Sequence, residues 1–374
     1  MFSLLQTSRF FAAFIVVLDH TTLTFGEPRY YGYMPMNGLF GSGRYGVDFF
    51  FVLSGFIICY AHWEDVAPEM ADRPQRLARF ANRRFIRIYP TYWVVLLLTL
   101  VPLYFSATRF DENIRSPWYL LNIFTLFQGN GNILTSAWTL THEVAFYALF
   151  ALVIWRRTLG IAVMTIWFGL SCLSFLTPLP FPTLSHPEHL GFLVGMIGSY
   201  LVRTAPIPSP KALFAIGLAG FMACCVLTGY FHVAGDINAI VEDPGPRGVL
   251  LPLLFFSFLI IVGLVEMERS GGLKAPSAWR FLGDASYSLY LLHFPALALV
   301  IKTFHSEHLE KHVPLIVLFF VSATVAVLAS LLFHRLIEKP LLVHCNNLFG
   351  MSRRAEPDTQ PRHHPALAAA TKDL

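Results

Sequence analysis

Long apolar runs, separated by short polar or basic segments, dominate the pattern of this chain. Ten runs are apolar enough for membrane helices: residues 10–25, 46–61, 88–105, 137–155, 160–176, 189–202, 212–231, 249–265, 285–300 and 313–333. A helix of about 20 apolar residues crosses the hydrocarbon core of a bilayer. The pattern therefore predicts an all-α integral membrane bundle of about ten transmembrane helices. One further stretch, 118–128, is shorter and is expected to be interfacial or re-entrant.

The composition points to the same class of protein. Of the 374 residues, 55% are hydrophobic and 13% are charged, whereas about 25% are charged in an average soluble protein. These values exclude a soluble enzyme, a disordered chain and a nucleic-acid-binding protein. The five cysteines show no ligand spacing, and a proline-containing loop separates His186 from His189. We therefore expect no metal site and no tightly bound cofactor.

The basic residues predict how the bundle is oriented. With ten spans and the N-terminus in the cytoplasm, 20 of the 27 Lys and Arg residues fall on the cytoplasmic side. This excess follows the positive-inside rule, so we expect both termini to be cytoplasmic. Residues 1–350 then form one transmembrane domain. Residues 351–374 are polar and aperiodic, and are expected to be a disordered cytoplasmic tail.

Three titratable side chains on different predicted spans fall at similar depth. At a rise of about 1.5 Å per residue, His20 lies about 16 Å from the basic edge of its run, and Glu143 and His293 lie about 20 Å from theirs. Ionisable groups inside a bilayer are costly and are candidates for function by default. Their shared depth predicts a buried polar chamber, although a structural hydrogen bond between helices would explain any single one. Asp48 stands near the outer end of its run, where a helix-start carboxylate is an equal interpretation.

Six motifs in order along the chain carry a family resemblance. They are RFFAAFIVVLDH (Arg9–His20), GVDFFFVLSGFII (Gly46–Ile58), RRFIRIYPTYW (Arg83–Trp93), WTLTHEVAFY (Trp138–Tyr147), SYSLYLLH (Ser286–His293) and Glu338-Lys339-Pro340. Together they resemble acyltransferase family 3, the membrane O-acyltransferases that modify bacterial polysaccharides and other extracytoplasmic acceptors. The resemblance covers nearly the whole chain.

The resemblance implies an activity and a location. The donor would be a cytoplasmic acyl-CoA, most often acetyl-CoA. The acceptor would be a hydroxyl of a carbohydrate or glycolipid, as in exopolysaccharide or lipopolysaccharide O-acetylation, reached from the membrane or its far side. The protein would be a multi-pass protein of the bacterial inner membrane, in contact with membrane lipids. The sequence leaves the acyl group, the acceptor and homo-oligomer formation open.

Within this resemblance, His20 is the candidate general base. A sugar hydroxyl is a poor nucleophile at pH 7, and an imidazole with a pKa near ~6.5 suits removal of its proton. Glu143 is expected to orient His20 or to bind acceptor hydroxyls, and a buried ion pair is the alternative. An acyl-histidine intermediate also remains open.

Basic and aromatic residues complete the candidate site. Guanidinium groups bind phosphate bidentately, so Arg9, Arg83, Arg84 and Arg87 are the candidates for binding the donor. Topology charges or lipid-headgroup contacts would also explain these arginines. The expected lining of the chamber or acceptor site is Asp48, Ser54, Trp138, Tyr147, Tyr287, Tyr290 and His293. Close helix packing at Ser54 and an aromatic packing seam are the alternatives.

A polytopic transporter or flippase without covalent chemistry is the rival prediction. Buried ionisable residues on several helices are also typical of such carriers. The clustered arginines and the lack of internal repeats favour the enzyme.

Overall fold

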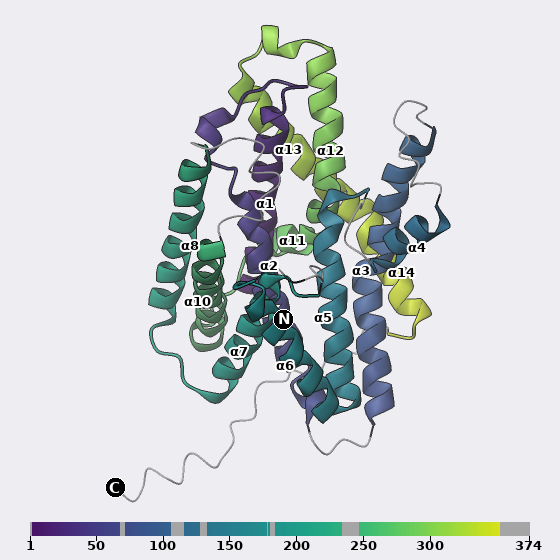
Figure 1. Ribbon diagram of the computed structural model, residues 1–374, viewed down its shortest axis with the longest axis vertical. Coiled ribbons are helices and arrows are strands. Elements are labelled where there is room, and N and C mark those ends of the chain that lie inside the picture. Colours follow the sequence, from purple (N-terminus) through teal and green to yellow (C-terminus); the bar gives the residue numbers. More distant parts are fainter. Residues whose placement is uncertain are drawn as a thin grey trace, which may run out of the picture.

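The computed structural model describes residues 2–67, 72–105, 116–127, 133–177, 179, 184–233 and 247–351. Every regular element among them is a helix (Figure 1). Eight helices are long and apolar enough to cross a membrane. The helices that form these candidate spans are α1 Ser3–Gly26, α2 Gly46–Ala61, α3 Arg73–Phe105, α5 Trp138–Trp155, α8 Pro210–Val233, α10 Arg247–Gly271, α12 Ser286–Ser306 and α13 Leu315–Phe333.

The other two predicted spans are also helices, but shorter ones. They are α6 Arg157–Leu173, with 17 residues, and α7 Leu190–Thr204, with 15. The stretch at 118–128 contains α4 Pro117–Thr125, which has nine residues. Two more short helices are α11 Ser277–Asp284 and α14 Lys339–Leu348. The all-α membrane fold is thus confirmed, while the count of ten spans and the N-in, C-in orientation stay predictions. The predicted tail, apart from Met351, lies outside the described residues.

The helices surround α1 and α2, which lie between α8 and α10 on one side and α3 and α5 on the other (Figure 1). In the most apolar window of α1 and of α2, 61% of residues are buried, against 28% in α8. The outer faces expose large apolar side chains, among them Leu218 and Leu227 of α8. In water such surfaces would be costly, so their natural surroundings are lipid.

Glycines allow a close crossing of α2 and α7. A Cβ atom on Gly55 of α2 would lie 2.1 Å from the carbonyl oxygen of Phe192 in α7. A Cβ on Gly195 of α7 would lie 2.0 Å from the carbonyl oxygen of Val52. Small residues let helix backbones approach this closely in membranes. The packing interpretation of the Ser54-Gly55 pair is therefore correct for Gly55, which leaves Ser54 free to serve the site.

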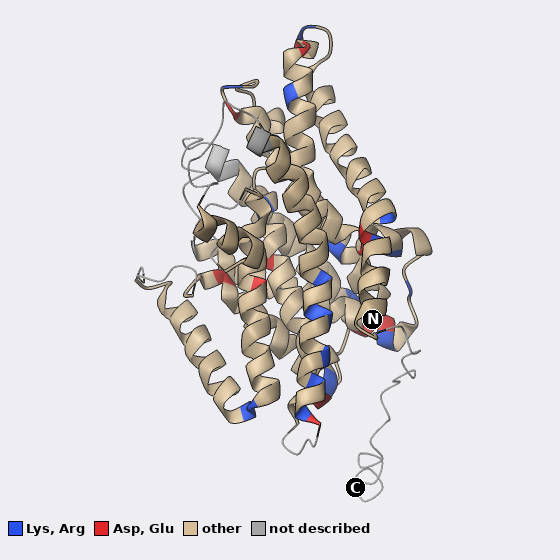
Figure 2. Ribbon diagram, turned by 90° about the vertical axis from the view of Figure 1, so that its right-hand side faces the viewer, with Lys and Arg blue, Asp and Glu red and all other residues tan. Residues whose placement is uncertain are grey.

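The basic stretch before the third span is not a separate loop. Arg73–Phe105 forms one helix of 33 residues, so the arginines and the apolar span belong to the same continuous helix. Figure 2 shows a column of basic residues along one long helix that faces the viewer, while most of the ribbon carries no charge. Because the helix begins at Arg73, Arg84 and Arg87 share one face of it, as residues three apart on a helix do.

A π-helical turn joins α13 to α14. Residues His334–Glu338 form this turn, and the chain continues as helix from Lys339. Such wide turns inside helices frequently occur at functional sites. Here the turn contains Glu338, whose surroundings are described below.

Candidate active site

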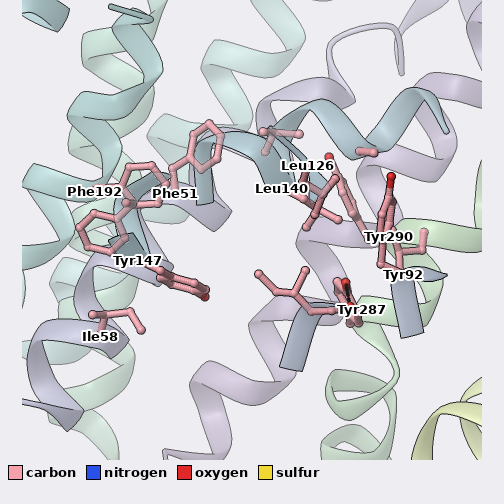
Figure 3. Packing of buried hydrophobic residues seen from close by; sticks show 14 of the residues in the cluster. Phe51, Ile58, Tyr92, Leu126, Leu140, Tyr147, Phe192, Tyr287 and Tyr290 are labelled. Atoms are coloured by element: carbon pink, nitrogen blue, oxygen red, sulfur yellow. Dashed lines mark hydrogen bonds between the residues drawn. The ribbon is translucent and has the colours of Figure 1, made fainter. Parts of the chain in front are cut away.

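Glu143 of α5 lies at the centre of a polar group on neighbouring helices. Its Oε1 accepts hydrogen bonds from the Ser54 hydroxyl of α2, at 2.8 Å, and from the Tyr147 hydroxyl one turn along α5. Figure 3 shows the Tyr147 hydroxyl pointing toward the element that carries Tyr287. Two predicted lining residues, Ser54 and Tyr147, are thus brought to the predicted catalytic carboxylate.

Arginines from two helices surround this carboxylate. The guanidinium of Arg84 lies 5.6 Å from the ring centre of Tyr147, and that of Arg87 lies 5.1 Å from the ring centre of Tyr287. Arg9 of α1 interacts electrostatically with Arg87 and Glu143. Arg83, by contrast, is exposed on the outside of α3. The structure therefore gathers three of the four predicted donor-binding arginines.

Glu338 lies close to Arg87. Its carboxylate is fully buried and accepts hydrogen bonds from the Ser288 hydroxyl, at 2.5 Å, and from His334 Nδ1, at 2.7 Å. The other carboxylate oxygen, Oε1, lies 3.7 Å from a guanidinium nitrogen of Arg87 and has no hydrogen-bond partner among the described residues. Glu338 belongs to the Glu-Lys-Pro motif, which by itself predicted no role for this residue. The structure places this buried carboxylate next to Arg87.

His20 lies deeper, against His293. The centres of their rings are 5.1 Å apart, and Phe294 lies 5.6 Å from His20 on the same side. His293 Nδ1 donates to the Leu289 carbonyl at 3.0 Å, so in a neutral ring the buried Nε2 carries the lone pair. The described contacts of Glu143 do not include His20. That Glu143 orients His20 stays a prediction, and the ring next to His20 is His293.

The two tyrosines of α12 connect these groups. The Tyr287 hydroxyl donates to the Ile88 carbonyl at 2.8 Å. The Tyr290 hydroxyl lies 2.7 Å from the Thr139 hydroxyl, and the Tyr290 ring is 6.1 Å from that of His293. Figure 3 shows both rings on the same side of the cluster. The predicted stripe of Tyr287, Tyr290 and His293 therefore exists and is buried.

An acidic group lies toward the N-terminal end of α2. Asp48 is buried, and its Oδ1 has no hydrogen-bond partner among the described residues. It interacts electrostatically with Glu188, in the short turn Pro187–His189, and with Arg44. The sequence offered no signal for Glu188 or Arg44, because both lie in loop segments outside the apolar runs.

A separate ion-pair network stabilises the opposite end of α2. Asp65 accepts hydrogen bonds from His62, at 2.7 Å, and from Arg76. Partial burial acts to raise the pKa of the Asp65 carboxyl, but the hydrogen bonds and the charges of His62 and Arg76 outweigh it and hold the pKa below its ordinary value. The network ties the end of α2 to the start of α3.

The described side chains thus form three groups: the arginines with Glu143, Tyr147 and Tyr287; the His20–His293 pair with Tyr290; and Asp48 with Glu188 and Arg44. An acyltransferase domain model matches residues 5–335. The chain belongs to this acyltransferase family.

Named relatives agree with this membership. The exopolysaccharide production protein ExoZ of Rhizobium meliloti is 30% identical over 70% of this chain and 79% of its own length. The acyltransferase MdmB of Streptomyces mycarofaciens is 26% identical over 88% of both chains. A Staphylococcus aureus protein named as an O-acetyltransferase is 25% identical over 80% of this chain, which spans 52% of that relative. No solved structure matches.

As a member of the acyltransferase family, the protein is a membrane enzyme that transfers acyl groups. Its described residues are chemically suited to that task. Arg9, Arg84 and Arg87 offer cationic forks of the kind that bind phosphate. Two imidazoles and a carboxylate offer proton acceptors within the bundle.

Proposed function

We propose that the protein transfers an acyl group, most simply acetyl, from cytoplasmic acyl-CoA to a hydroxyl of an exported or surface carbohydrate. The enzyme would lie in the bacterial inner membrane with both termini inside. The observation that carries the proposal is the separation of two polar groups: Arg84 lies over the ring of Tyr147, which bonds Glu143, whereas His20 and His293 lie further along α1 and α12 from Arg9 and Tyr287. A donor with an anionic head and a thioester at the end of a long arm needs two groups that are separated in this way.

The arginine group would bind the phosphates of CoA. Arg84 and Arg87 come from a helix that is continuous through the basic region, and Arg9 reaches the same place from α1. Arg84 lies over the ring of Tyr147, and Arg87 lies over the ring of Tyr287 and 3.7 Å from the carboxylate of Glu338. Pre-positioned cations bind an anion without first being ordered, which favours affinity.

In the second group, His20 would act as general base. The acceptor oxygen attacks the thioester carbonyl as His20 takes the hydroxyl proton. The carbon–sulfur bond then breaks, and the proton returns to the CoA thiolate, so the products are an ester and free CoA. His293 lies against His20 and presents a lone pair at Nε2, which supports a second acceptor for a hydroxyl proton or a substrate hydrogen bond.

A carbohydrate acceptor is supported by the relatives and by the side chains. One relative is named for exopolysaccharide production and another as an O-acetyltransferase. Aromatic rings with neighbouring carboxylates and hydroxyls are suited to a sugar, which has apolar faces and a polar rim. Trp138, Tyr290 and Asp48 provide such groups.

The test is release of free CoA from acetyl-CoA by protein reconstituted in lipid, with surface polysaccharide of the source bacterium as acceptor. Release should require the polysaccharide. It should fall by at least about 100-fold in His20→Ala, the usual contribution of a general base. His344→Ala changes an exposed histidine of α14 and should keep full activity.

The arginine group is tested in the same assay. Arg87→Gln should raise the KM for acetyl-CoA, whereas Arg79→Gln, an exposed arginine of the same helix, should not. If the wild type releases no CoA with several acyl-CoAs but moves an intact glycolipid across the bilayer, the transporter prediction replaces the enzyme. If His20→Ala keeps full activity, His20 is not the base.

A further inference from the structure

A chain of three buried side chains lies outside the catalytic residues proposed above. His142 Nδ1 and His189 Nε2 are 2.7 Å apart, and His189 Nδ1 is 3.1 Å from the Ser171 hydroxyl. All three residues are almost completely buried. They come from α5, the turn before α7, and α6, so the chain links three elements.

The hydrogen bonds that link His142, His189 and Ser171 all donate in the same direction. The Ser171 hydroxyl donates to the Trp167 carbonyl at 3.1 Å, and a carbonyl oxygen can only accept. His189 Nδ1 must therefore donate to Ser171, and His189 Nε2 must accept from His142 Nδ1. A neutral imidazole carries one N–H, so the Nε2 of His142 is left as a hydrogen-bond acceptor. These hydrogen bonds therefore fix the tautomer of His142.

The ring of His142 faces aromatic and polar neighbours. The Trp138 ring centre lies 5.5 Å away, at an interplanar angle of 82°, and the His186 ring centre lies 5.2 Å away. Trp138 and His186 are themselves 6.0 Å apart and keep partial exposure. The three rings thus stand around one place, on the same side of the bundle as Asp48.

Polar atoms around these rings have no hydrogen-bond partner among the described residues. They are His186 Nδ1, Glu188 Oε2 and Asp48 Oδ1, and Asp48 is 4% exposed. Glu188 Oε2 is 3.8 Å from His186 Nδ1, too far for a hydrogen bond. Buried polar atoms are normally paired, and each exception calls for an explanation. A ligand that brings several hydroxyl groups would satisfy these atoms.

We infer that His142, Trp138 and His186 form a hydroxyl-binding subsite for a sugar ring of the acceptor. This inference rests on the proposed function and extends it. The sugar would lie against Trp138 and donate a hydroxyl hydrogen to His142 Nε2. Further hydroxyl groups would donate to the carboxylates of Glu188 and Asp48. The subsite would contact a part of the acceptor next to the hydroxyl that reacts, and not the reacting hydroxyl itself.

Metal binding does not account for the cluster. The facing nitrogens of His142 and His189 already bond each other at 2.7 Å. Among the residues that the structure describes, no three His, Cys, Asp or Glu side chains are arranged to hold a metal ion.

The test compares His142→Phe with His142→Gln in the CoA-release assay, with source polysaccharide as the varied acceptor. Phenylalanine keeps an aromatic ring but removes Nε2 as well as the Nδ1 that bonds His189. The loss of Nε2 should raise the KM for polysaccharide about tenfold, as for one lost hydrogen bond. Glutamine restores a polar group near Nε2 and should recover most of the loss. The KM for acetyl-CoA should stay unchanged in both variants. His312→Phe changes an exposed histidine and controls for the substitution itself.

Binding of the same polysaccharide to wild type and to His142→Phe, measured by calorimetry in lipid nanodiscs, tests the subsite without turnover. Weaker binding by His142→Phe supports it. An unchanged acceptor KM and unchanged binding overturn it, as does an equal rise in both KM values, which indicates a packing role. A wild type that binds polysaccharide but releases no CoA contradicts the proposed function and leaves the binding comparison to decide the subsite.

Discussion

The ion pair between Arg87 and Glu338 allows a quantitative prediction. At 3.7 Å, two unit charges attract by about 4.5 kcal/mol at an effective dielectric of about 20 and by about 1 kcal/mol in bulk water. Glu338 is fully buried, but the side chain of Arg87 is 29% exposed, so solvent screens the pair in part. We expect a coupling energy of about 2 kcal/mol between these limits.

The assay is a double-mutant cycle with Arg87→Gln, Glu338→Gln and the double variant. Each protein is unfolded in detergent micelles by titration with sodium dodecyl sulfate. Tryptophan fluorescence follows the transition and gives the free energy of unfolding. Glutamine at position 338 keeps an acceptor oxygen for the Ser288 hydroxyl, so the cycle isolates the charge. Distant, independent sites add within about 0.5 kcal/mol. A cycle with Arg79→Gln in place of Arg87→Gln should show that additivity.

Additivity within about 0.5 kcal/mol for the Arg87 cycle would refute the reasoning. The carboxylate would then be held by Ser288 and His334 alone. A coupling well above the bulk-water value would show that Glu338 fixes Arg87 in the folded enzyme.

Three other substitutions test separate features. Gly55→Ala should lower the stability of the folded protein by at least about 1–3 kcal/mol, because its Cβ would overlap a backbone carbonyl. Gly169→Ala would meet nothing within 4 Å and should be tolerated. Thermal melts compare the two variants, and equal melting midpoints would contradict the close crossing. Asp65→Asn should lower the melting midpoint at pH 7, and the difference should shrink below about pH 4, because a carboxyl with a depressed pKa loses its stabilisation as pH falls through that pKa; a pH-independent difference would argue against the ion pairs. Tyr147→Phe removes a hydroxyl that donates to Glu143 and should lower kcat about tenfold with little change in stability; an unchanged kcat would place this bond outside catalysis.

The sequence was sufficient where the property is local. Apolar length and helical spacing predicted the helices, and the one-face spacing of Tyr287, Tyr290 and His293 predicted a buried stripe that the structure contains. The basic stretch before residue 88 lay outside the predicted span of residues 88–105, because charge is usually a solvent signal. It is helical because arginine is a good helix former and no breaker interrupts it after Pro74 until Pro90.

Contacts between distant segments were not predictable. Nothing in the spacing of Asp48 and Glu188 shows that they meet, since the turn at Pro187 is placed by packing of α7 against α2. The partner of His20 is a similar case. Shared depth suggested Glu143, but depth along the membrane says nothing about direction around the helix, and the adjacent ring is that of His293.

The length of α3 has a consequence for how the enzyme meets its donor. Thirty-three residues span about 50 Å of helix, while the hydrocarbon core of a bilayer is about 30 Å thick. The helix is therefore long enough to extend beyond the lipid, with its basic half at the water boundary. An anionic molecule arriving from the water would be attracted first to the basic half of α3. The same helix continues from there into the interior of the bundle. The rate of encounter should then fall with rising salt.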